Sequence, residues 1–141
     1  MTINWNITGI WFVKIISALI MLQTLYFKFS GAQESIYIFS RLGMEPWGRI
    51  GTGILELIAS ILILYPRTTV IGAILGTGLM SGAILFHLTK LGVSVQGDGG
   101  QLFIYALLVL LSCSFLLFNN RKEIFDFISH YLIRKWEILF I

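Results

Sequence analysis

The chain has 141 residues, of which 57% are hydrophobic and 12% are charged, and its mean hydropathy is +0.86. Soluble domains carry about 25% charged residues, so this composition excludes an ordinary water-soluble protein and indicates an integral membrane protein. The net charge of +3 comes from 10 basic and 7 acidic residues. The basic residues are scattered along loops and helix ends without forming a stripe, which argues against nucleic acid as a partner.

Four hydrophobic segments predict four transmembrane helices, at about residues 10–29, 47–65, 70–91 and 101–118. A bilayer core of about 30 Å needs about 20 apolar residues for each helix, and each segment approaches that length. The predicted fold class is therefore all-α, a four-helix transmembrane bundle that forms one domain over residues 1–120.

Two further helices are expected outside the spans. Ile36, Phe39 and Leu42 follow one another at helical intervals before Gly43, which predicts a short interfacial helix between the first two spans. Polar and apolar residues separate onto two sides over residues 121–141, which predicts an amphipathic helix on the membrane surface.

Loop charges predict an orientation. With four spans, both termini lie on one side of the membrane, and that side collects six of the ten basic residues: Lys14, Arg67, Arg121, Lys122, Arg134 and Lys135. Because cytoplasmic loops are enriched in Lys and Arg, both termini are expected in the cytoplasm. Lys14 contributes through a side chain that snorkels to the interface.

The third span is rich in glycine. Gly72, Gly76, Gly78 and Gly82 form two successive G-x-x-x-G spacings, which allow a neighbouring helix to approach closely. All four are interpreted as packing residues.

The sequence contains no complete catalytic motif. Cys113 is the only cysteine, which excludes an internal disulfide, and its apolar surroundings favour an inert buried thiol. Ser112 and Ser114 have no histidine on their segment to activate them.

Ionisable residues inside the spans need an explanation, since each raises the free energy of membrane insertion by about 2.5 to 3.5 kcal/mol at a helix centre. Glu56 lies nine residues after Trp47 and hence near the middle of the second span, with Arg49 on the same face. His87 lies on the same stripe of the third span as Gly76. These faces are expected to point inward and to form one polar pocket, made of Lys28, Arg49, Glu56, His87, Asp98 and Gln101.

Two interpretations of this pocket remain open. In the structural one, Glu56 pairs with Arg49, Lys28 or His87, or is protonated, and fixes the helix register. In the functional one, the pocket binds a small amphipathic ligand or a quinone headgroup. His87 and Glu56 then exchange protons, and Arg49 or Lys28 supplies charge. No metal site is predicted, because Glu56 and His87 are too few as ligands.

Several short motifs, in this order and spacing, resemble the DoxX-like membrane proteins of bacteria over roughly Ile10 to Phe118. They are Phe27-Lys28-Phe29, Gly43-Met44-Glu45-Pro46-Trp47-Gly48-Arg49-Ile50-Gly51, Gly53-Ile54-Leu55-Glu56-Leu57, Tyr65-Pro66-Arg67, Phe86-His87-Leu88 and Gly97-Asp98-Gly99-Gly100. The resemblance implies a four-helix protein of the bacterial inner membrane, from a family that includes a subunit of a thiosulfate:quinone oxidoreductase. Glu56 and His87 correspond to the family's second-span glutamate and third-span histidine, for which the resemblance implies no catalytic mechanism.

The leading functional hypothesis is an accessory subunit of a membrane redox system that binds a quinone. The first alternative is a non-enzymatic scaffold or assembly factor that acts through the glycine faces and the C-terminal tail. A small proton-coupled transporter is the second alternative, for which the four helices would assemble as a homo-oligomer.

Overall fold

The computed structural model describes residues 5–139, and the regular structure in that range is helical. The elements in chain order are α1 (Trp5–Ser30), α2 (Gln33–Arg41), α3 (Trp47–Leu64), α4 (Thr69–Phe86), the π-helical turn η1 (His87–Leu91), α5 (Gln101–Asn119) and α6 (Arg121–Leu139).

Four stretches of helix are long and apolar enough to cross a membrane, namely Asn6–Ser30, Trp47–Leu64, Thr69–Leu91 and Gln101–Asn119. They match the four predicted spans, with η1 continuing α4 to complete the third. The predicted all-α fold with four membrane-spanning helices is confirmed.

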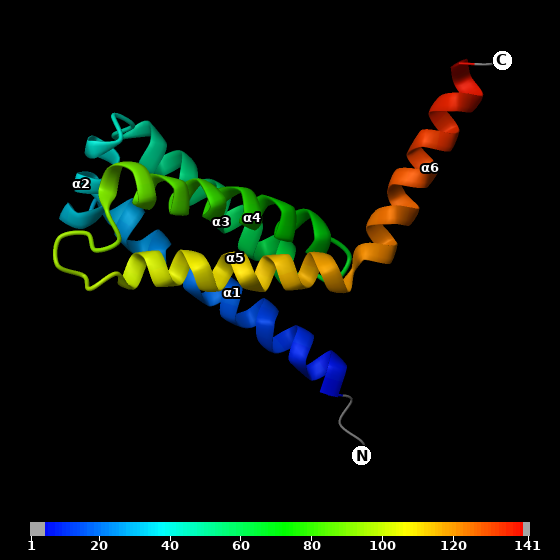
Figure 1. Ribbon diagram of the computed structural model, residues 1–141, viewed down its shortest axis with the longest axis horizontal. Helices are drawn as coiled ribbons and strands as arrows, with labels where there is room; N and C mark the ends of the chain where they lie inside the picture. The colour runs from blue at the N-terminus through cyan, green and yellow to red at the C-terminus, as the bar shows by residue number, and fades with distance from the viewer. Residues whose placement is uncertain (1–4, 140–141) are drawn as a thin grey trace.

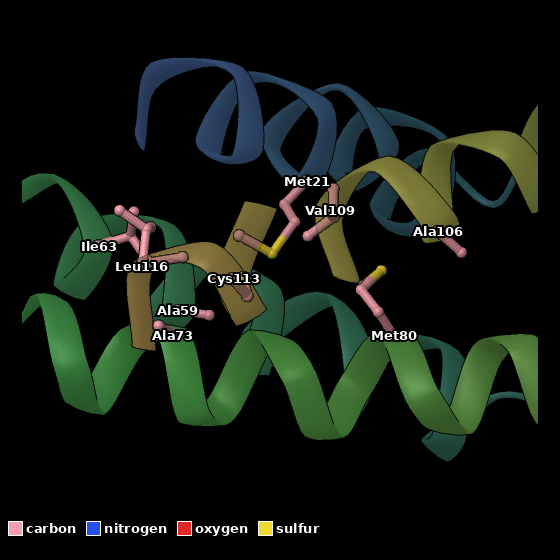
Figure 2. Close-up of a cluster of buried hydrophobic side chains, with 9 residues drawn as sticks. All are labelled: Met21, Ala59, Ile63, Ala73, Met80, Ala106, Val109, Cys113 and Leu116. Carbon is pink, nitrogen blue, oxygen red and sulfur yellow. The ribbon is translucent and has the colours of Figure 1, made fainter. Parts of the chain in front are cut away.

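The four long helices lie along one another as a bundle (Figure 1), in which α1 and α4 each pack beside both α3 and α5. Their inner sides meet in an apolar core (Figure 2), which consists of Met21, Ala59, Ile63, Ala73, Met80, Ala106, Val109, Cys113 and Leu116. The bundle has two unlike ends. The turn end carries the short α3–α4 connection at residues 65–68 and the start of α6, and the α2 end carries α2 and the loop at residues 92–100.

The predicted helix between the first two spans is confirmed as α2, which packs across the α2 end against α1, α3 and η1. Ser35 and Phe39 form its buried side. Gly43 follows with a φ of +71°, a conformation that glycine adopts without steric cost and that turns the chain toward α3.

Helices α3 and α4 approach most closely near the turn end. A Cβ atom added to Gly72 would lie 2.6 Å from the backbone N of Ile63 and 2.9 Å from the backbone O of Ala59. A Cβ atom on Gly76 would lie 2.8 Å from Sγ of Cys113 in α5. The structure therefore places Gly72 and Gly76 at close helix contacts, as their spacing predicts.

Gly78 and Gly82 do not follow this prediction. Nothing lies within 4 Å of a Cβ atom added to either one. Within the described chain no helix packs against this pair, because the helical rotation of about 100° per residue carries both glycines away from the contact that Gly72 makes. They border open space instead.

Lys14 does not snorkel. Lys14 is only 6% exposed. Its ammonium donates a hydrogen bond of 2.8 Å to Oγ1 of Thr69 and lies 5.0 Å from the ring centroid of Trp11. The hydroxyl at the start of α4 offers an acceptor inside the bundle, so the side chain turns inward. Lys14 thereby ties α1 to α4 at the turn end.

The predicted C-terminal helix is present as α6, which points away from the bundle (Figure 1) and has its main contacts with the end of α5. Phe125, Phe127 and Ile133 are exposed along it. Residues 140–141 of the predicted helix lie outside the described residues, and its position on a membrane surface stays a prediction.

Candidate functional site

A cavity of about 490 Å³ lies at the α2 end of the bundle, lined by all four spans and by α2. Its size falls within the range of about 300 to 1,000 Å³ that is typical of small-molecule sites. The walls are mostly apolar and include three of the four methionines of the chain, Met21, Met44 and Met80. Methionine adapts its shape to irregular ligands, so this lining suits a flexible apolar molecule.

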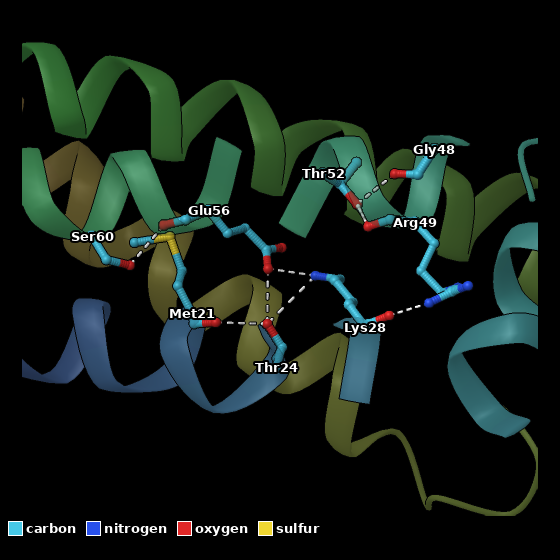
Figure 3. A network of polar contacts seen from close by, with 8 residues as sticks. All are labelled: Met21, Thr24, Lys28, Gly48, Arg49, Thr52, Glu56 and Ser60. Carbon is cyan, nitrogen blue, oxygen red and sulfur yellow. Dashed lines mark hydrogen bonds and ion pairs between the residues drawn. The ribbon is translucent and has the colours of Figure 1, made fainter. Parts of the chain in front are cut away.

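Glu56 provides the deepest charge at the cavity wall, and it is only 5% exposed. Its Oε2 atom forms an ion pair with Nζ of Lys28 and lies 2.8 Å from Oγ1 of Thr24 (Figure 3). The hydroxyl of Thr24 also lies 2.8 Å from the backbone O of Met21. Since a hydroxyl has one proton, Thr24 donates to one of these oxygens at a time, and Lys28 remains the constant partner of Glu56.

The other carboxylate oxygen, Oε1 of Glu56, receives no hydrogen bond from the described part of the chain, although Glu56 lines the cavity. A carboxylate oxygen accepts hydrogen bonds strongly, more so away from bulk water. Glu56 can therefore hold its helix contact through one oxygen and present the other to a ligand.

Arg49 is not part of this site, which corrects the prediction. Its guanidinium donates to both carboxylate oxygens of Glu45 at 2.7 to 3.0 Å and to the backbone O of Lys28. Glu45 lies four residues before Arg49, one helical turn away, and therefore pairs with the guanidinium in place of Glu56. The carbonyl of Lys28 is one of the last in α1 and lacks an intrahelical partner, so Arg49 caps that helix. Arg49 does not line the cavity.

His87 is buried at the cavity wall, where it begins η1. Its Nδ1 lies 2.8 Å from the backbone O of Gly92, and its ring makes an edge contact with Phe103 at 5.7 Å between centroids. Because a carbonyl only accepts, Nδ1 carries a proton, and Nε2 is an acceptor whenever the ring carries no second proton. This hydrogen bond fixes the orientation of the imidazole.

Asp98 and Gln101 lie at the rim of the cavity, where α5 begins. Oδ1 of Asp98 accepts hydrogen bonds of 2.8 Å from the backbone N–H groups of Val95 and Gly100, and Oδ2 accepts one from Leu102. Asp98 therefore holds the first turn of α5 through the backbone N–H of Leu102, while the N-cap position itself is Gly100. Gln101 is exposed, and its amide donates to the hydroxyl of Tyr105 at 2.6 Å.

Asp98 is the acid whose charge most clearly supports local structure. Burial raises the pKa of Asp98, but the hydrogen bonds from Gly100, Val95, Leu102 and Ser94 outweigh burial and hold the pKa below its usual value of 3.8. A depressed pKa stabilises the fold above pH 3.8, and this stabilisation is lost as the pH falls through the lower, folded-state pKa.

Replacing Asp98 with asparagine is expected to loosen the loop at residues 92–100 and to cost about 1 kcal/mol at pH 7, because the cap loses its charge and one acceptor oxygen. The difference in unfolding free energy between the variant and the wild type should shrink below pH 3.8. Amide hydrogen exchange at pH 7 measures the loosening of the loop, and thermal unfolding in detergent at pH 7 and pH 3 measures the stability. A variant difference that does not change with pH would show that the charge of Asp98 has no such role.

Five of the six residues predicted for the pocket line one cavity, namely Lys28, Glu56, His87, Asp98 and Gln101. The sequence interpretation missed Thr24, which lies one helical turn before Lys28 and bridges to Glu56. It also missed Glu45 as the partner of Arg49. The four-residue spacings were visible in both cases, but a threonine inside a span usually bonds to its own helix, and Pro46 marked Glu45 as lying outside one.

The polar groups of the cavity can bind a compact head that carries carbonyl or hydroxyl oxygens. Lys28 has three N–H donors, of which one pairs with Glu56 and one approaches Thr24 at 3.4 Å. Glu56 Oε1 and His87 Nε2 are acceptors. Within residues 5–139, no three His, Cys, Asp or Glu side chains come together in a way that could hold a metal ion.

The chain was compared with protein families, curated proteins and solved structures. The model of the DoxX-like family matches residues 12–115. This range includes the second and third spans, most of the first and fourth, and the whole cavity lining. No curated protein and no solved structure gives a significant match. On the strength of the family match, this multi-pass membrane protein belongs to the DoxX-like family.

Proposed function

We propose that this protein is an accessory subunit of a membrane redox system and that its cavity binds a quinone. The observation that carries the proposal is the placement of Glu56, Lys28 and His87 on the wall of an otherwise apolar cavity of about 490 Å³. A partner subunit supplies the electrons, and this chain supplies the binding site. The proposed setting is a bacterial inner membrane with both termini in the cytoplasm.

The donors and acceptors at the wall suit both forms of a quinone. The oxidised form offers carbonyl oxygens, which need donors, and the third N–H of Lys28 is free of the contacts described above. The reduced form offers hydroxyl groups, which need acceptors, and Glu56 Oε1 and His87 Nε2 are available. Since His87 is held by Gly92 through Nδ1, a hydroxyl that reaches Nε2 meets an acceptor already in place.

Mass spectrometry of small molecules that copurify with the protein tests this function. A quinone is expected to be enriched over the lipid extract of the same membranes in the wild type and depleted in Glu56→Gln. The matched control is Glu45→Gln, which removes a carboxylate that pairs with Arg49 outside the cavity lining and should keep the quinone. The proposal is overturned if no quinone is enriched in the wild type, or if both variants lose it equally.

A second function, as a membrane scaffold or assembly factor, is favoured by the exposed Phe125, Phe127 and Ile133 of α6. Exposed aromatic side chains on one element are typical of surfaces that bind a partner or a membrane. Phe125→Ser/Phe127→Ser is then expected to lose a copurifying membrane subunit that Glu56→Gln retains. The opposite pattern would assign the association to the cavity.

A further inference from the structure

We infer that the cavity opens sideways into the lipid between α3 and α4, and that Gly78 and Gly82 form the opening through which the hydrocarbon chain of its ligand passes. For the polar head of the ligand, this inference rests on the proposed function. It adds the class of ligand, an amphiphile with a compact head and one long hydrocarbon chain, and it names two residues that select for that chain.

The first observation is that both glycines line the cavity and yet border open space. Gly78 is exposed and Gly82 is half-buried, and no atom lies within 4 Å of a Cβ atom added to either one. A residue that is both exposed and part of the lining marks a place where a cavity reaches the molecular surface; Gln23, Phe27, Glu34 and Gln101 do so nearer the α2 end, and Gly78 does so deeper in the bundle. The missing side chains therefore leave a passage through the wall.

The second observation is the depth of this passage. Gly78 lies nine residues after Thr69, and Gly82 lies nine residues before Leu91, in the span Thr69–Leu91. At the helical rise, each is about 14 Å from the nearer end of the span, close to the bilayer midplane. The passage therefore faces hydrocarbon, which admits an apolar chain readily and a charged solute at high cost.

The side of α4 follows from the helix rotation. Gly76 meets Cys113 of α5, whereas Gly72 meets the backbone of α3. Gly82 and Gly78 lie about 80° and 120° beyond Gly72, on the side away from Gly76. This flank is the lipid-facing edge of α4 beside α3. The cavity lining runs from it across Leu79 and Ala83, which lie about 20° on either side of Gly72, and continues on α3 at Thr52 and Glu56.

A hydrocarbon chain fits this opening better than a second copy of the protein. The four-residue spacing of Gly78 and Gly82 is also typical of helix contacts between chains. A partner helix would cover the gap without filling the cavity behind it. A ligand chain would fill both, with its head at Glu56 and its chain leaving past Leu79 and Ala83.

Leucine substitutions test the opening, because nothing lies within 4 Å of the new Cβ atoms and the fold should tolerate them. Gly78→Leu and Gly82→Leu are compared with Gly51→Leu, a helical glycine of α3 with the same open surroundings and no place in the lining. Binding of decylubiquinone and of duroquinone, which lacks the long chain, is measured in lipid nanodiscs.

Gly78→Leu and Gly82→Leu are expected to weaken decylubiquinone binding about tenfold, roughly the effect of losing two buried methylenes, with duroquinone binding unchanged. Gly51→Leu should change neither. Equal weakening of both quinones, or of neither, overturns the opening. A shift of Gly82→Leu to a smaller oligomer on gel filtration also overturns it, in favour of a second copy.

Failure of the proposed function has a different signature. If the wild type binds neither quinone, the proposed function is overturned, and the opening is decided by native mass spectrometry of retained lipids. Gly82→Leu should then lose retained single-chain amphiphiles that Gly51→Leu keeps. The opening is overturned if both variants and the wild type retain the same lipids.

Discussion

Replacing Lys28 with methionine is expected to destabilise the bundle by about 3 to 5 kcal/mol, because it strands a buried carboxylate. The side chain of Glu56 is 7% exposed, and Lys28 is its constant partner. Without Lys28, the remaining donor is the hydroxyl of Thr24, which the backbone O of Met21 also attracts. Unfolding by SDS titration in mixed micelles measures the loss.

Replacing the other partner of the ion pair, Glu56→Gln, should destabilise the bundle less than Lys28→Met does. The side chain of Lys28 is 14% exposed and lies in the last turn of α1, where the helix dipole favours a positive charge. The glutamine also keeps an acceptor for Thr24. Lys28→Met/Glu56→Gln should recover most of the loss, since removing a whole buried pair is often nearly neutral. Strict additivity of the two single costs would contradict a direct interaction.

Replacing Gly72 with alanine is expected to destabilise the protein by at least about 1 to 3 kcal/mol, the usual cost of overpacking. The added Cβ atom would meet the backbone of Ile63 at 2.6 Å and that of Ala59 at 2.9 Å. Helical backbone atoms cannot turn aside as a side chain can, so α3 and α4 must separate. The fully buried Ile63 then loses packing.

Gly78→Ala is the matched control for this effect, since it makes the same chemical change in the same helix with no atom within 4 Å. It should unfold at the same SDS fraction as the wild type or at a higher one, because alanine favours helix over glycine. Equal stability of Gly72→Ala and Gly78→Ala would show that the close contact between α3 and α4 has little energetic weight.

The helices themselves were predictable, because length and hydropathy decide which segments can span a bilayer. The predicted 47–65 and 101–118 differ from Trp47–Leu64 and Gln101–Asn119 by a single residue at one end. The first span begins earlier than predicted, at Asn6, because the polar residues around Thr8 form additional helical turns before the apolar run.

The pairing inside the site was less predictable. Helical periodicity places Glu56 on an inward face, but it does not say which neighbouring helix supplies the partner. Lys28, Arg49 and His87 were all possible partners of Glu56 on the sequence alone. Glu45 forms an ion pair with Arg49, and Lys28 is the residue that pairs with Glu56. The periodicity of the glycines could have separated Gly78 from Gly72, but the repeated spacing suggested one role for all four.

The two ends of the bundle differ in how tightly α3 and α4 are held. At the turn end, Lys14 bonds to Thr69 and Gly72 lies against α3. At the α2 end, α3 and α4 border the cavity. A small tilt of α4 about Gly72 would change the passage at Gly78, while Ala59, Ile63 and Ala73 near the turn end keep their packing. A ligand can therefore enter from the lipid without any helix unfolding.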